Sequence, residues 1–428
     1  NSPTMCQLFV DWALQPVRRH FSNAIIYHYM DDILISTKQL LTDADLNWLI
    51  LQLKHQGLTV SSEKVQWSAP WKYLGWLITD AQIRPQKITL HTDISTLHDA
   101  QRHFGDLQWV RTTVGITNDD LQPFLPWLHV SDANSPRVCT LEQQKALIRV
   151  SEKLQHGWSA CCMEHVPLSL FLSNADACPL AIVFQWQKKK GESQPGSAAI
   201  LLEWVFLSVQ PKSCVMSRTD ALAALIQKGR DRILEIDGKE PADISVPVKN
   251  EDLEWLLRQS VALQEALLGF TGVVQNKQPK GPMWYFIKRY QWLERPLCSL
   301  KPVEGKTVFT DAGRRTKEAV CVWQRRGKWL KYLIRGDTRD SLQTLELKAV
   351  CWALQILLPS AGKAEPLNVV SDSLYVAGVV QRIEDALLRR AQNQHLGELF
   401  LQLRSVLKQR QHVFCIMHIR SHRCHNGL

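Results

Sequence analysis

The sequence predicts a multidomain protein that combines α/β and α+β architecture, and three observations lead to this fold class. The chain has 428 residues, and a typical domain has about 150, so roughly three domains are expected. Apolar residues make up 45% of the chain and charged residues 21%, as in folded rather than disordered proteins. Strand-type and helix-type patterns alternate along the chain, which is typical of sheets covered by helices.

Composition excludes a membrane-spanning protein and favours an anionic partner. The longest apolar run, residues 198–209, is interrupted by Glu203 and is too short to span a bilayer. The eleven cysteines are odd in number and lack a repeated short spacing, which favours reduced thiols over a disulfide framework. The net charge of +10 and the 16 tryptophans favour a nucleic acid as the partner. The chain begins at Asn1 without a secretory signal, so we expect a processed chain or a fragment.

The first part of the chain alternates helix and strand patterns. Helical apolar spacing predicts helices at residues 5–21 and 43–56. Between them, Asp31 and Asp32 separate two β-rich runs, which predicts a β-hairpin from residues 24–30 and 33–36. One further short strand is expected at residues 73–79.

Helical and strand patterns alternate again in the middle of the chain. Amphipathic helices are predicted at residues 93–110 and 141–156, with a proline-bearing stretch between them at residues 122–137. At Pro167 the pattern changes to strands, which we expect at residues 168–173 and 180–187. A Lys/Gly/Ser-rich loop at residues 188–197 follows, and later helices are expected at residues 220–234 and 250–268.

The last section predicts an α/β domain of about 120 residues with a mixed sheet. Its strands are expected at residues 307–310, 319–324, 328–335, 367–371 and 413–419. Its helices are expected at residues 341–358, 373–380 and 393–409. Residues 168–186 and 307–323 both follow the order strand, Asp-containing turn, strand, so two domains are expected to share one topology.

Asp31 and Asp32 are the first candidate catalytic and metal-binding residues. Two adjacent carboxylates on a tight turn offer the oxygen ligands that Mg²⁺ prefers. A polar turn with two solvated aspartates explains the same pattern, because two-metal phosphoryl transfer needs a further carboxylate from another strand. No suitable carboxylate precedes the hairpin, since Asp11 falls within the first predicted helix.

Asp311, Glu346 and Asp372 form the second candidate site. Both aspartates follow a predicted strand, and Glu346 lies one turn into a predicted helix. If the strands are neighbours, the three carboxylates meet at one end of the sheet, the usual place for a site in an α/β fold. Like charges about 4 Å apart repel by roughly 1 to 4 kcal/mol, so a fold that gathers them implies one or two cations. Three unrelated solvent-facing acids are the alternative.

Gln101, Gly105 and Trp109 recur at intervals of four residues and therefore share one helix face. Gly inside a helix is destabilising by up to about 1 kcal/mol relative to Ala, so it usually has a reason. One reason is a strip that lies along the minor groove of a duplex. The other is a helix crossing, with Trp109 packed in a core.

Basic and metal-ligating residue types also gather in the last section. The basic residues adjoin Asp311 and favour phosphate contact, although a solvated hairpin face has the same composition: Arg314, Arg315, Lys317, Arg325, Arg326, Lys328 and Lys331. The C-terminal residues with zinc-ligand chemistry are His418, His422, Cys424 and His425. Because His418 belongs to an apolar strand pattern, zinc is disfavoured.

Several of these motifs, in this order, resemble those of retroviral reverse transcriptase. The palm is resembled by Asn1-Ser2-Pro3-Thr4, Tyr29-Met30-Asp31-Asp32, Gly57-Leu58 through Lys64, and Tyr73-Leu74-Gly75-Trp76. The run from His98 to Trp109 is similar to the thumb helix of that family. The ribonuclease H domain is resembled by Thr310-Asp311, Thr344 through Leu347, Ser371 through Val376, and His418 through His422. The detail most resembles the Pol protein of betaretrovirus-like (group K) endogenous retroviruses.

The resemblance implies four domains and a role for each candidate residue. The domains are the C-terminal part of the palm, the thumb, the connection and ribonuclease H, at residues 1–88, 89–165, 166–300 and 301–428. The polymerase residues are two of three metal ligands, Asp31 and Asp32, a primer grip of Tyr73, Leu74 and Gly75, and a minor-groove track of Gln101, Gly105 and Trp109. In ribonuclease H, two Mg²⁺ ions, with Mn²⁺ as a substitute, are bound by Asp311, Glu346 and Asp372, beside a loop with His422.

The function implied is that of a reverse transcriptase and ribonuclease H fragment that hydrolyses RNA in RNA–DNA hybrids. We expect its RNA-directed DNA polymerase module to be incomplete, because the family's first catalytic aspartate and the fourth ribonuclease H aspartate have no counterpart in the sequence. Expected partners are RNA–DNA hybrid and template–primer duplex, without a membrane, and a second polymerase subunit is compatible with this. The expected location is cytoplasmic or virion-associated. The alternatives are a catalytically dead nucleic-acid-binding remnant and a structural subunit of a complete polymerase.

Overall fold

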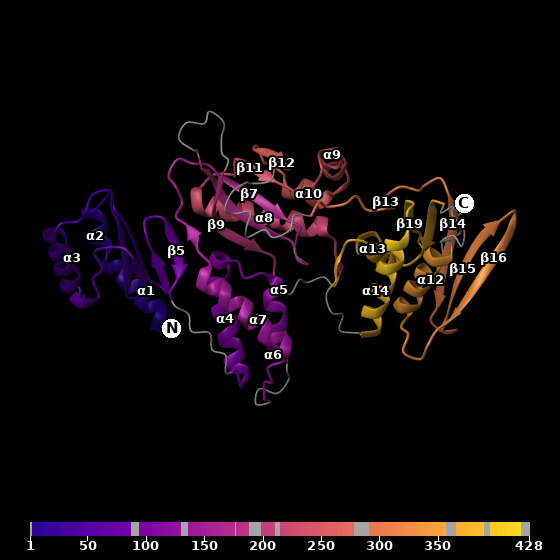
Figure 1. The fold of residues 1–428 in the computed structure, drawn as a ribbon, viewed down its shortest axis with the longest axis horizontal. Helices are drawn as coiled ribbons and strands as arrows, with labels where there is room; N and C mark the ends of the chain where they lie inside the picture. The colour runs from indigo at the N-terminus through magenta and orange to yellow at the C-terminus, as the bar shows by residue number, and fades with distance from the viewer. Residues whose placement is uncertain are drawn as a thin grey trace. The chain divides into compact units, whose positions relative to one another are not determined.

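The computed structural model describes residues 2–86, 94–129, 136–175, 177–187, 198–209, 215–277, 291–356, 365–388 and 394–420. The chain divides into two compact units, Asn1–Ile116 with Val130–Cys162, and Thr117–His129 with Met163–Leu428. Helices and mixed sheets occur in both units (Figure 1), which confirms the expected α/β and α+β class. None of the described helices combines the length and apolar character that a membrane span requires.

The first unit opens with three helices around a small apolar core. These helices are α1 (Ser2–Ala13), α2 (Gln15–His20) and α3 (Asp43–His55). Their buried residues include Val10, Leu14, Leu49 and Leu53. The single helix expected at residues 5–21 is wrong, because the chain forms two helices that meet at Leu14. Pro16 lies in the first turn of α2, where its missing N–H does no harm, whereas inside one continuous helix it would remove a hydrogen bond.

The expected β-hairpin is present, but its turn lies one residue earlier than expected. Strands β1 (Ile25–Tyr29) and β2 (Asp32–Ser36) are antiparallel, and Tyr29 pairs with Asp32. The two turn residues are therefore Met30 and Asp31, and Met30 takes the positive φ of +54°. Asp32 begins the second strand instead of completing the turn.

A four-stranded antiparallel sheet follows in the same unit. Its strands are β3 (Trp71–Tyr73), β4 (Trp76–Ile78), β5 (Gln82–Pro85) and β6 (Ser159–Ala160), and the 3₁₀ turn η1 (Ser62–Lys64) precedes them. The single strand expected at residues 73–79 is wrong, because Leu74 and Gly75 form a tight turn between β3 and β4. Gly75 has a φ of +82°, a conformation that glycine adopts without steric cost.

Two longer helices complete the first unit, α4 (Leu97–Val114) and α7 (Leu141–His156). Each begins with a capping box, in which Thr96 pairs with Asp99 and Thr140 pairs with Gln143. The cap at Thr96 explains why α4 begins at Leu97, later than residue 93. On the buried face of α4 the residues recur at helical spacing, at Ala100, His103, Leu107, Val110 and Val114.

The second unit contains a five-stranded mixed sheet covered by a long helix. Its strand order is β12-β11-β7-β8-β9, formed by β7 (Leu168–Ser173), β8 (Leu180–Gln187), β9 (Ala198–Phe206), β11 (Asp243–Ser245) and β12 (Val273–Gln275). The helices are α5 (Asn118–Leu121), η2 (Gln122–Phe124), α6 (Leu125–Leu128), α8 (Arg218–Asp237), α9 (Asn250–Gln259) and α10 (Val261–Ala266). Helix α8 approaches the sheet closely, because a Cβ on Gly229 would lie 2.6 Å from Leu170. The single helix expected at residues 250–268 is wrong, since Ser260 ends α9 and caps α10.

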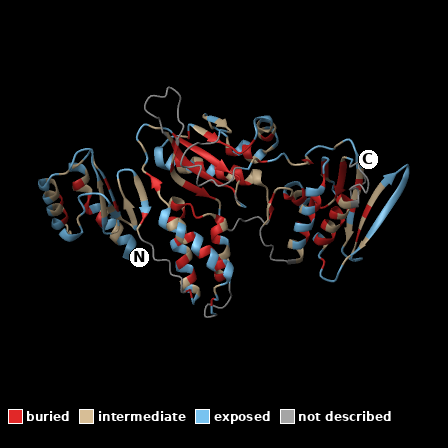
Figure 2. Ribbon diagram, in the orientation of Figure 1, coloured by how far each residue is buried: buried red, intermediate tan, exposed pale blue. Residues whose placement is uncertain are grey.

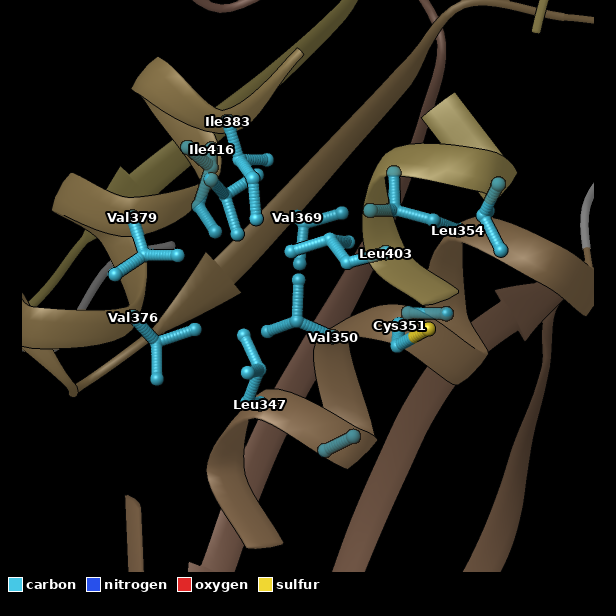
Figure 3. Packing of buried hydrophobic residues seen from close by; sticks show 14 of the residues in the cluster. Leu347, Val350, Cys351, Leu354, Val369, Val376, Val379, Ile383, Leu403 and Ile416 are labelled. Carbon is cyan, nitrogen blue, oxygen red and sulfur yellow. The ribbon is translucent and has the colours of Figure 1, made fainter. Parts of the chain in front are cut away.

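The last section forms a six-stranded mixed sheet with the expected succession of elements. The strand order is β13-β19-β17-β14-β15-β16. The strands are β13 (Cys298–Ser299), β14 (Lys306–Gly313), β15 (Glu318–Arg325), β16 (Lys328–Arg335), β17 (Leu367–Ser371) and β19 (Phe414–His418). Helices α12 (Leu342–Ile356), α13 (Leu374–Ile383) and α14 (Gln394–Gln409) contribute to one apolar core, part of which Figure 3 shows.

The two sheets of the second unit share one topology, which confirms the predicted repeat. In each, three antiparallel strands come first, and two later strands add in parallel to the first of the three. The strand pairings relate Asp311 and Asp372 to Leu172 and Val246 of the first sheet. Both of the latter are buried in the apolar core. The first sheet therefore repeats the fold of the second without its carboxylates.

A short seam joins the two sheets of this unit. Strand β10 (Val215–Met216) pairs with β18 (Leu387–Leu388), which follows α13. The Glu384 carboxylate accepts hydrogen bonds from the backbone N–H of Leu297 at 2.9 Å. Burial raises the pKa of the neighbouring Asp385 carboxyl to about 6, against the charge of Arg218, which lowers it. Acidic side chains thus lie inside this seam.

Candidate active site and nucleic-acid interface

Strand pairing brings Asp311 and Asp372 to the same edge of the six-stranded sheet. β14 and β17 are parallel neighbours, and Thr310 pairs with Ser371. The hydroxyl of Thr310 donates to the carbonyl of Val370 at 3.0 Å, which ties the two strands together next to the acids. Each aspartate is the residue that follows this pair. The prediction that two strand ends would bring these carboxylates together is therefore consistent with the register.

Glu346 faces the two aspartates from α12. Its carboxyl is half-buried, and burial is the main reason why its pKa lies above the ordinary value. The negative charges of Asp372 and Asp311 raise the pKa further, whereas a hydrogen bond with Ser373 lowers it. Electrostatic repulsion of this kind acts only between neighbouring groups. The three predicted carboxylates therefore share one environment.

Asp372 carries a buried oxygen that lacks a partner. Its Oδ1 is inaccessible to solvent and accepts no hydrogen bond from any residue that the structure describes. A buried carboxylate oxygen without a partner bears the full cost of desolvation. A divalent cation between the acids would supply that missing partner, and oxygen is the ligand that Mg²⁺ prefers.

The three carboxylates do not form a closed cage around a metal ion. Among residues 2–420 outside the gaps given above, no three His, Cys, Asp or Glu side chains lie close enough to hold one. Asp311 is exposed, and its Oδ1 accepts the backbone N–H of Ala312 at 2.7 Å. The acids are thus close enough to repel one another but not to enclose an ion by themselves.

The C-terminal end of the chain leads away from the same sheet edge. His418, at the end of β19, pairs with Ser371, and Ile419 donates its N–H to Ser371 at 3.0 Å. His418 is exposed and lies in a strand, as its apolar pattern indicated. His422 falls outside the described residues, as do the other zinc-type residues of the cluster.

Asp31 and Asp32 are exposed at the tip of the β1–β2 hairpin. Neither is joined by a third acid within the part of the chain that the structure describes. The backbone N–H of Met30, which has the strained positive φ, donates to Gln7 Oε1 at 2.6 Å. A side chain from α1 therefore holds the turn that carries the two aspartates.

The strand behind this turn is anchored by residues that the sequence did not single out. His28 is 6% exposed, and its Nδ1 lies 3.1 Å from an Arg18 nitrogen. Because Arg only donates, His28 accepts at Nδ1 and donates from Nε2 to the carbonyl of Gln7 at 3.1 Å. Arg18 also pairs with Asp11 at 2.8 Å. A polar chain from α2 to α1 fixes the hairpin, and only its long-range contacts reveal it.

Tyr73, Leu74 and Gly75 lie at the β3–β4 turn in the same unit as the two aspartates. Burial raises the pKa of Tyr73 to about 12, and the nearby Tyr27 and Asp32 contribute to the rise. The Tyr73 hydroxyl is buried and has no hydrogen-bond partner among the described residues. Leu74 adopts a φ of +47°, which is unusual for a branched side chain. The predicted primer-grip residues therefore form a strained turn next to Asp32.

Gln101, Gly105 and Trp109 form an exposed strip along α4. All three are exposed, and Trp109 retains 59% of its surface. No atom lies within 4 Å of the position where a Cβ on Gly105 would stand. The alternative of a helix crossing is therefore wrong, because Gly105 meets no neighbour and Trp109 is not in the core. The Trp109 ring stacks on Trp76 with 6.3 Å between centroids, which places a flat aromatic surface beside the β3–β4 turn.

The basic residues of the last section are all exposed, as expected. They lie on the β14–β15 turn and the β15–β16 hairpin, where Figure 2 shows β16 exposed along most of its length. Trp329, also on β16, is 62% exposed and its ring centroid lies 6.2 Å from that of Phe309. Exposed cations next to aromatic rings suit contact with a nucleic acid.

Four protein families match successive parts of the chain. The family described as Reverse transcriptase (RNA-dependent DNA polymerase) matches residues 1–78, and Reverse transcriptase thumb domain matches residues 85–148. The ERVK-8-like, RNaseH-like domain matches residues 176–284, and RNase H matches residues 304–427. The ribonuclease-H-like match on the first sheet of the second unit agrees with the repeated topology described above.

Relatives align with almost the whole chain. The Gag-Pro-Pol polyproteins of squirrel monkey retrovirus and mouse mammary tumor virus (strain BR6) are 31% and 32% identical over 99% of this chain. The chain covers 22% and 23% of those polyproteins. The Intracisternal A-particle Pol-related polyprotein of mouse intracisternal a-particle MIA14 is 30% identical, and the chain covers 46% of its length. With its reverse transcriptase, thumb and ribonuclease H domains in sequence, the chain belongs to the reverse transcriptase and ribonuclease H region of the retroviral Pol family.

Proposed function

We propose that this chain hydrolyses the RNA strand of RNA–DNA hybrids with the help of a divalent metal ion. Asp311, Glu346 and Asp372 are the proposed catalytic residues and metal ligands. The observation that supports this best is the unpartnered, buried Oδ1 of Asp372 beside two other carboxylates. A fold normally avoids such an arrangement unless a cation offsets it.

The three carboxylates would hold Mg²⁺, or Mn²⁺ in its place. A bound divalent cation supplies charge neutralisation at the scissile phosphate and lowers the pKa of an attacking water. The protein's part is to orient the acids: Asp311 and Asp372 through the parallel strands, and Glu346 through its helix. Selection of RNA over DNA rests on the 2′-hydroxyl, which only the RNA strand offers next to the scissile phosphate.

Substrate binding is proposed for two surfaces, one in each unit. In the first unit, Gln101, Gly105 and Trp109 offer a polar group, a bare backbone and a flat ring to a duplex minor groove. In the second unit, the exposed basic residues next to Asp311 attract phosphates. Both surfaces suit RNA–DNA hybrid and template–primer duplex, because neither requires a particular base sequence.

The polymerase part is proposed to use Asp31 and Asp32 as two metal ligands. Their support is the fixed, strained turn at Met30 and the exposure of both carboxylates. Tyr73, Leu74 and Gly75 are proposed to position the primer strand. We also retain His422 as a residue of the loop beside the hydrolytic site, and we keep the four domains at residues 1–88, 89–165, 166–300 and 301–428.

A second candidate function is binding without catalysis. The absence of a closed cage among the described acids favours it. In that case the thumb strip and the basic surface would hold a duplex, and the chain would act as a binding remnant or as a structural subunit beside a second polymerase subunit. A cytoplasmic or virion-associated location is proposed for either function.

Hydrolysis of labelled RNA distinguishes the two candidates. The same RNA is offered single-stranded and paired with DNA, with millimolar Mg²⁺ or Mn²⁺ or with excess chelator. We expect cleavage only of the paired RNA, only with metal, and abolished by Glu346→Gln. Cleavage that persists in chelator or in Glu346→Gln would contradict the proposed site, and stable hybrid binding without cleavage would favour the binding function.

A further inference from the structure

A fully buried carboxylate lies next to the helix that carries Glu346. Asp340 precedes α12 by one residue, and 0% of its side chain is exposed. Its Oδ2 accepts a hydrogen bond from Lys348 Nζ at 2.6 Å and one from the backbone N–H of Asp337 at 2.7 Å. Its Oδ1 lies 2.8 Å from His395 Nε2. All four contacts are thus directed at one buried residue that has no place in the proposed chemistry.

The contacts of Asp340 join separate elements around the proposed site. Lys348 lies on α12, two residues beyond Glu346, and His395 lies in the first turn of α14. The carbonyl of Asp340 accepts from Lys317 Nζ at 2.8 Å, and Lys317 ends the turn that follows Asp311 on β14. One residue therefore connects the turn after Asp311, the helix of Glu346 and a third helix.

The backbone next to this residue is fitted closely. Lys317 adopts a φ of +54°, and its carbonyl accepts the N–H of Gly336 at 2.8 Å. A Cβ at Gly336 would lie 2.9 Å from that carbonyl and 2.5 Å from Leu345, the residue before Glu346. Only glycine leaves room here for the loop to pass between the Asp311 turn and α12.

The apolar core alone does not fix the position of Glu346. Leu347, Val350 and Leu354 pack α12 against its neighbours, as Figure 3 shows. Apolar packing is non-directional, whereas charge-assisted hydrogen bonds constrain both distance and angle. The pKa of the Asp340 carboxyl is about 2: burial raises it, but the hydrogen bonds from Lys348, the Asp337 backbone and His395 outweigh burial. The carboxylate is therefore held in its charged, hydrogen-bonding form.

We propose that Asp340 is a positioning residue that sets the place of Glu346 relative to Asp311 in the hydrolytic site. This role rests on the proposed function, because it concerns how the carboxylates meet around a metal ion. Asp340 touches none of the reacting atoms. It acts by holding Lys348 on α12 and Lys317 at the end of the turn after Asp311.

The test measures how much metal the full chain needs to cleave a hybrid. Cleavage of labelled RNA in a hybrid is followed against Mn²⁺ concentration for the wild type, Asp340→Asn and Lys348→Gln. Outer residues that orient metal ligands typically change metal affinity by about 10-fold to 100-fold. We expect both variants to need about 10-fold more Mn²⁺ for half-maximal rate. Hybrid affinity, measured in chelator, should stay at the wild-type value, and calorimetric titration with Mn²⁺ alone should show the same loss.

Matched controls separate positioning from loss of charge or of fold. Asp337→Asn removes an acid from the same loop whose side chain pairs with Arg339 and not with α12, and Lys408→Gln removes an exposed cation from α14. Both controls should keep the wild-type Mn²⁺ requirement. Lys348 is 22% exposed, so Lys348→Gln decides the question if Asp340→Asn fails to fold.

The outcomes distinguish failure of this role from failure of the proposed function. A wild type that neither cleaves hybrid nor binds Mn²⁺ overturns both. A wild type that cleaves, with variants that have lower melting temperatures but an unchanged Mn²⁺ requirement, overturns the positioning role alone. A raised requirement in Lys348→Gln but not in the controls supports it.

Discussion

Gly105 gives the sharpest separation of stability from binding. It lies in the middle of α4, and nothing stands within 4 Å of the place where a Cβ would be added. Gly105→Ala therefore meets no clash and gains the full difference in helix propensity, about 1 kcal/mol. That gain corresponds to a roughly fivefold larger folding equilibrium constant. If the bare position served only the fold, alanine would be the better residue.

A large side chain at this position should act on duplex binding alone. Gly105→Trp should fold, because the space is open, but its ring would occupy the strip between Gln101 and Trp109. We expect hybrid affinity to fall more than affinity for single strands, since only a duplex has a minor groove to lie along the strip. Gln144→Trp, at an exposed position of α7, is the control for an added exposed ring.

The assay combines denaturant unfolding with fluorescence anisotropy of labelled hybrid and labelled single strand. We expect Gly105→Ala to raise the unfolding midpoint, and Gly105→Trp to reduce hybrid affinity selectively while Gln144→Trp binds like the wild type. Equal losses on both substrates would refute the minor-groove role of the strip. A lower unfolding midpoint for Gly105→Ala would refute the reasoning from open space.

Three other predictions concern charge, pH and a buried hydroxyl. The logarithm of hybrid affinity should fall linearly with the logarithm of salt concentration in a titration by anisotropy, because Lys and Arg displace counterions from phosphates; an affinity insensitive to salt would contradict phosphate contact. Asp385→Asn should flatten the pH dependence of stability. Its folded-state pKa is about 6, above the ordinary 3.8, so the wild type loses up to about 3 kcal/mol as pH rises from about 4 through 6, measurable by thermal unfolding. Tyr73→Phe should leave stability unchanged or raise it by about 1 kcal/mol in denaturant unfolding, since the buried hydroxyl has no partner among the described residues; a loss above 1 kcal/mol would reveal a hidden partner.

The last section of the chain could be predicted element by element, because its strands are short apolar runs between turn residues. β16 matches its expected bounds, and β14, β15 and β17 differ by three residues or fewer. The repeat also followed from the sequence, since the order of strands recurs. By contrast, β9 was visible only as an apolar run, and β11 and β12, with three residues each, are too short for alternation to show.

The carboxylates could be predicted because each stands at the end of a regular element, whereas their supports could not. Asp340 contacts residues that are 8 and 55 positions away, and Gln7 contacts Met30 across 23 positions. Such contacts depend on tertiary packing and leave no local pattern. Likewise, the positive φ of Met30 and Leu74 contradicts local preference, because the hairpins that they close determine it.

The most direct test of the hydrolytic site replaces Asp372, whose buried oxygen lacks a partner among the described residues. Hybrid with labelled RNA is incubated with the wild type or Asp372→Asn at millimolar Mg²⁺ or Mn²⁺, and binding is measured in parallel without metal. We expect Asp372→Asn to lose cleavage while it binds hybrid as tightly as the wild type or slightly more tightly, because a negative charge facing phosphate is removed. Cleavage that survives in Asp372→Asn would contradict the assignment of Asp311, Glu346 and Asp372 as the hydrolytic site.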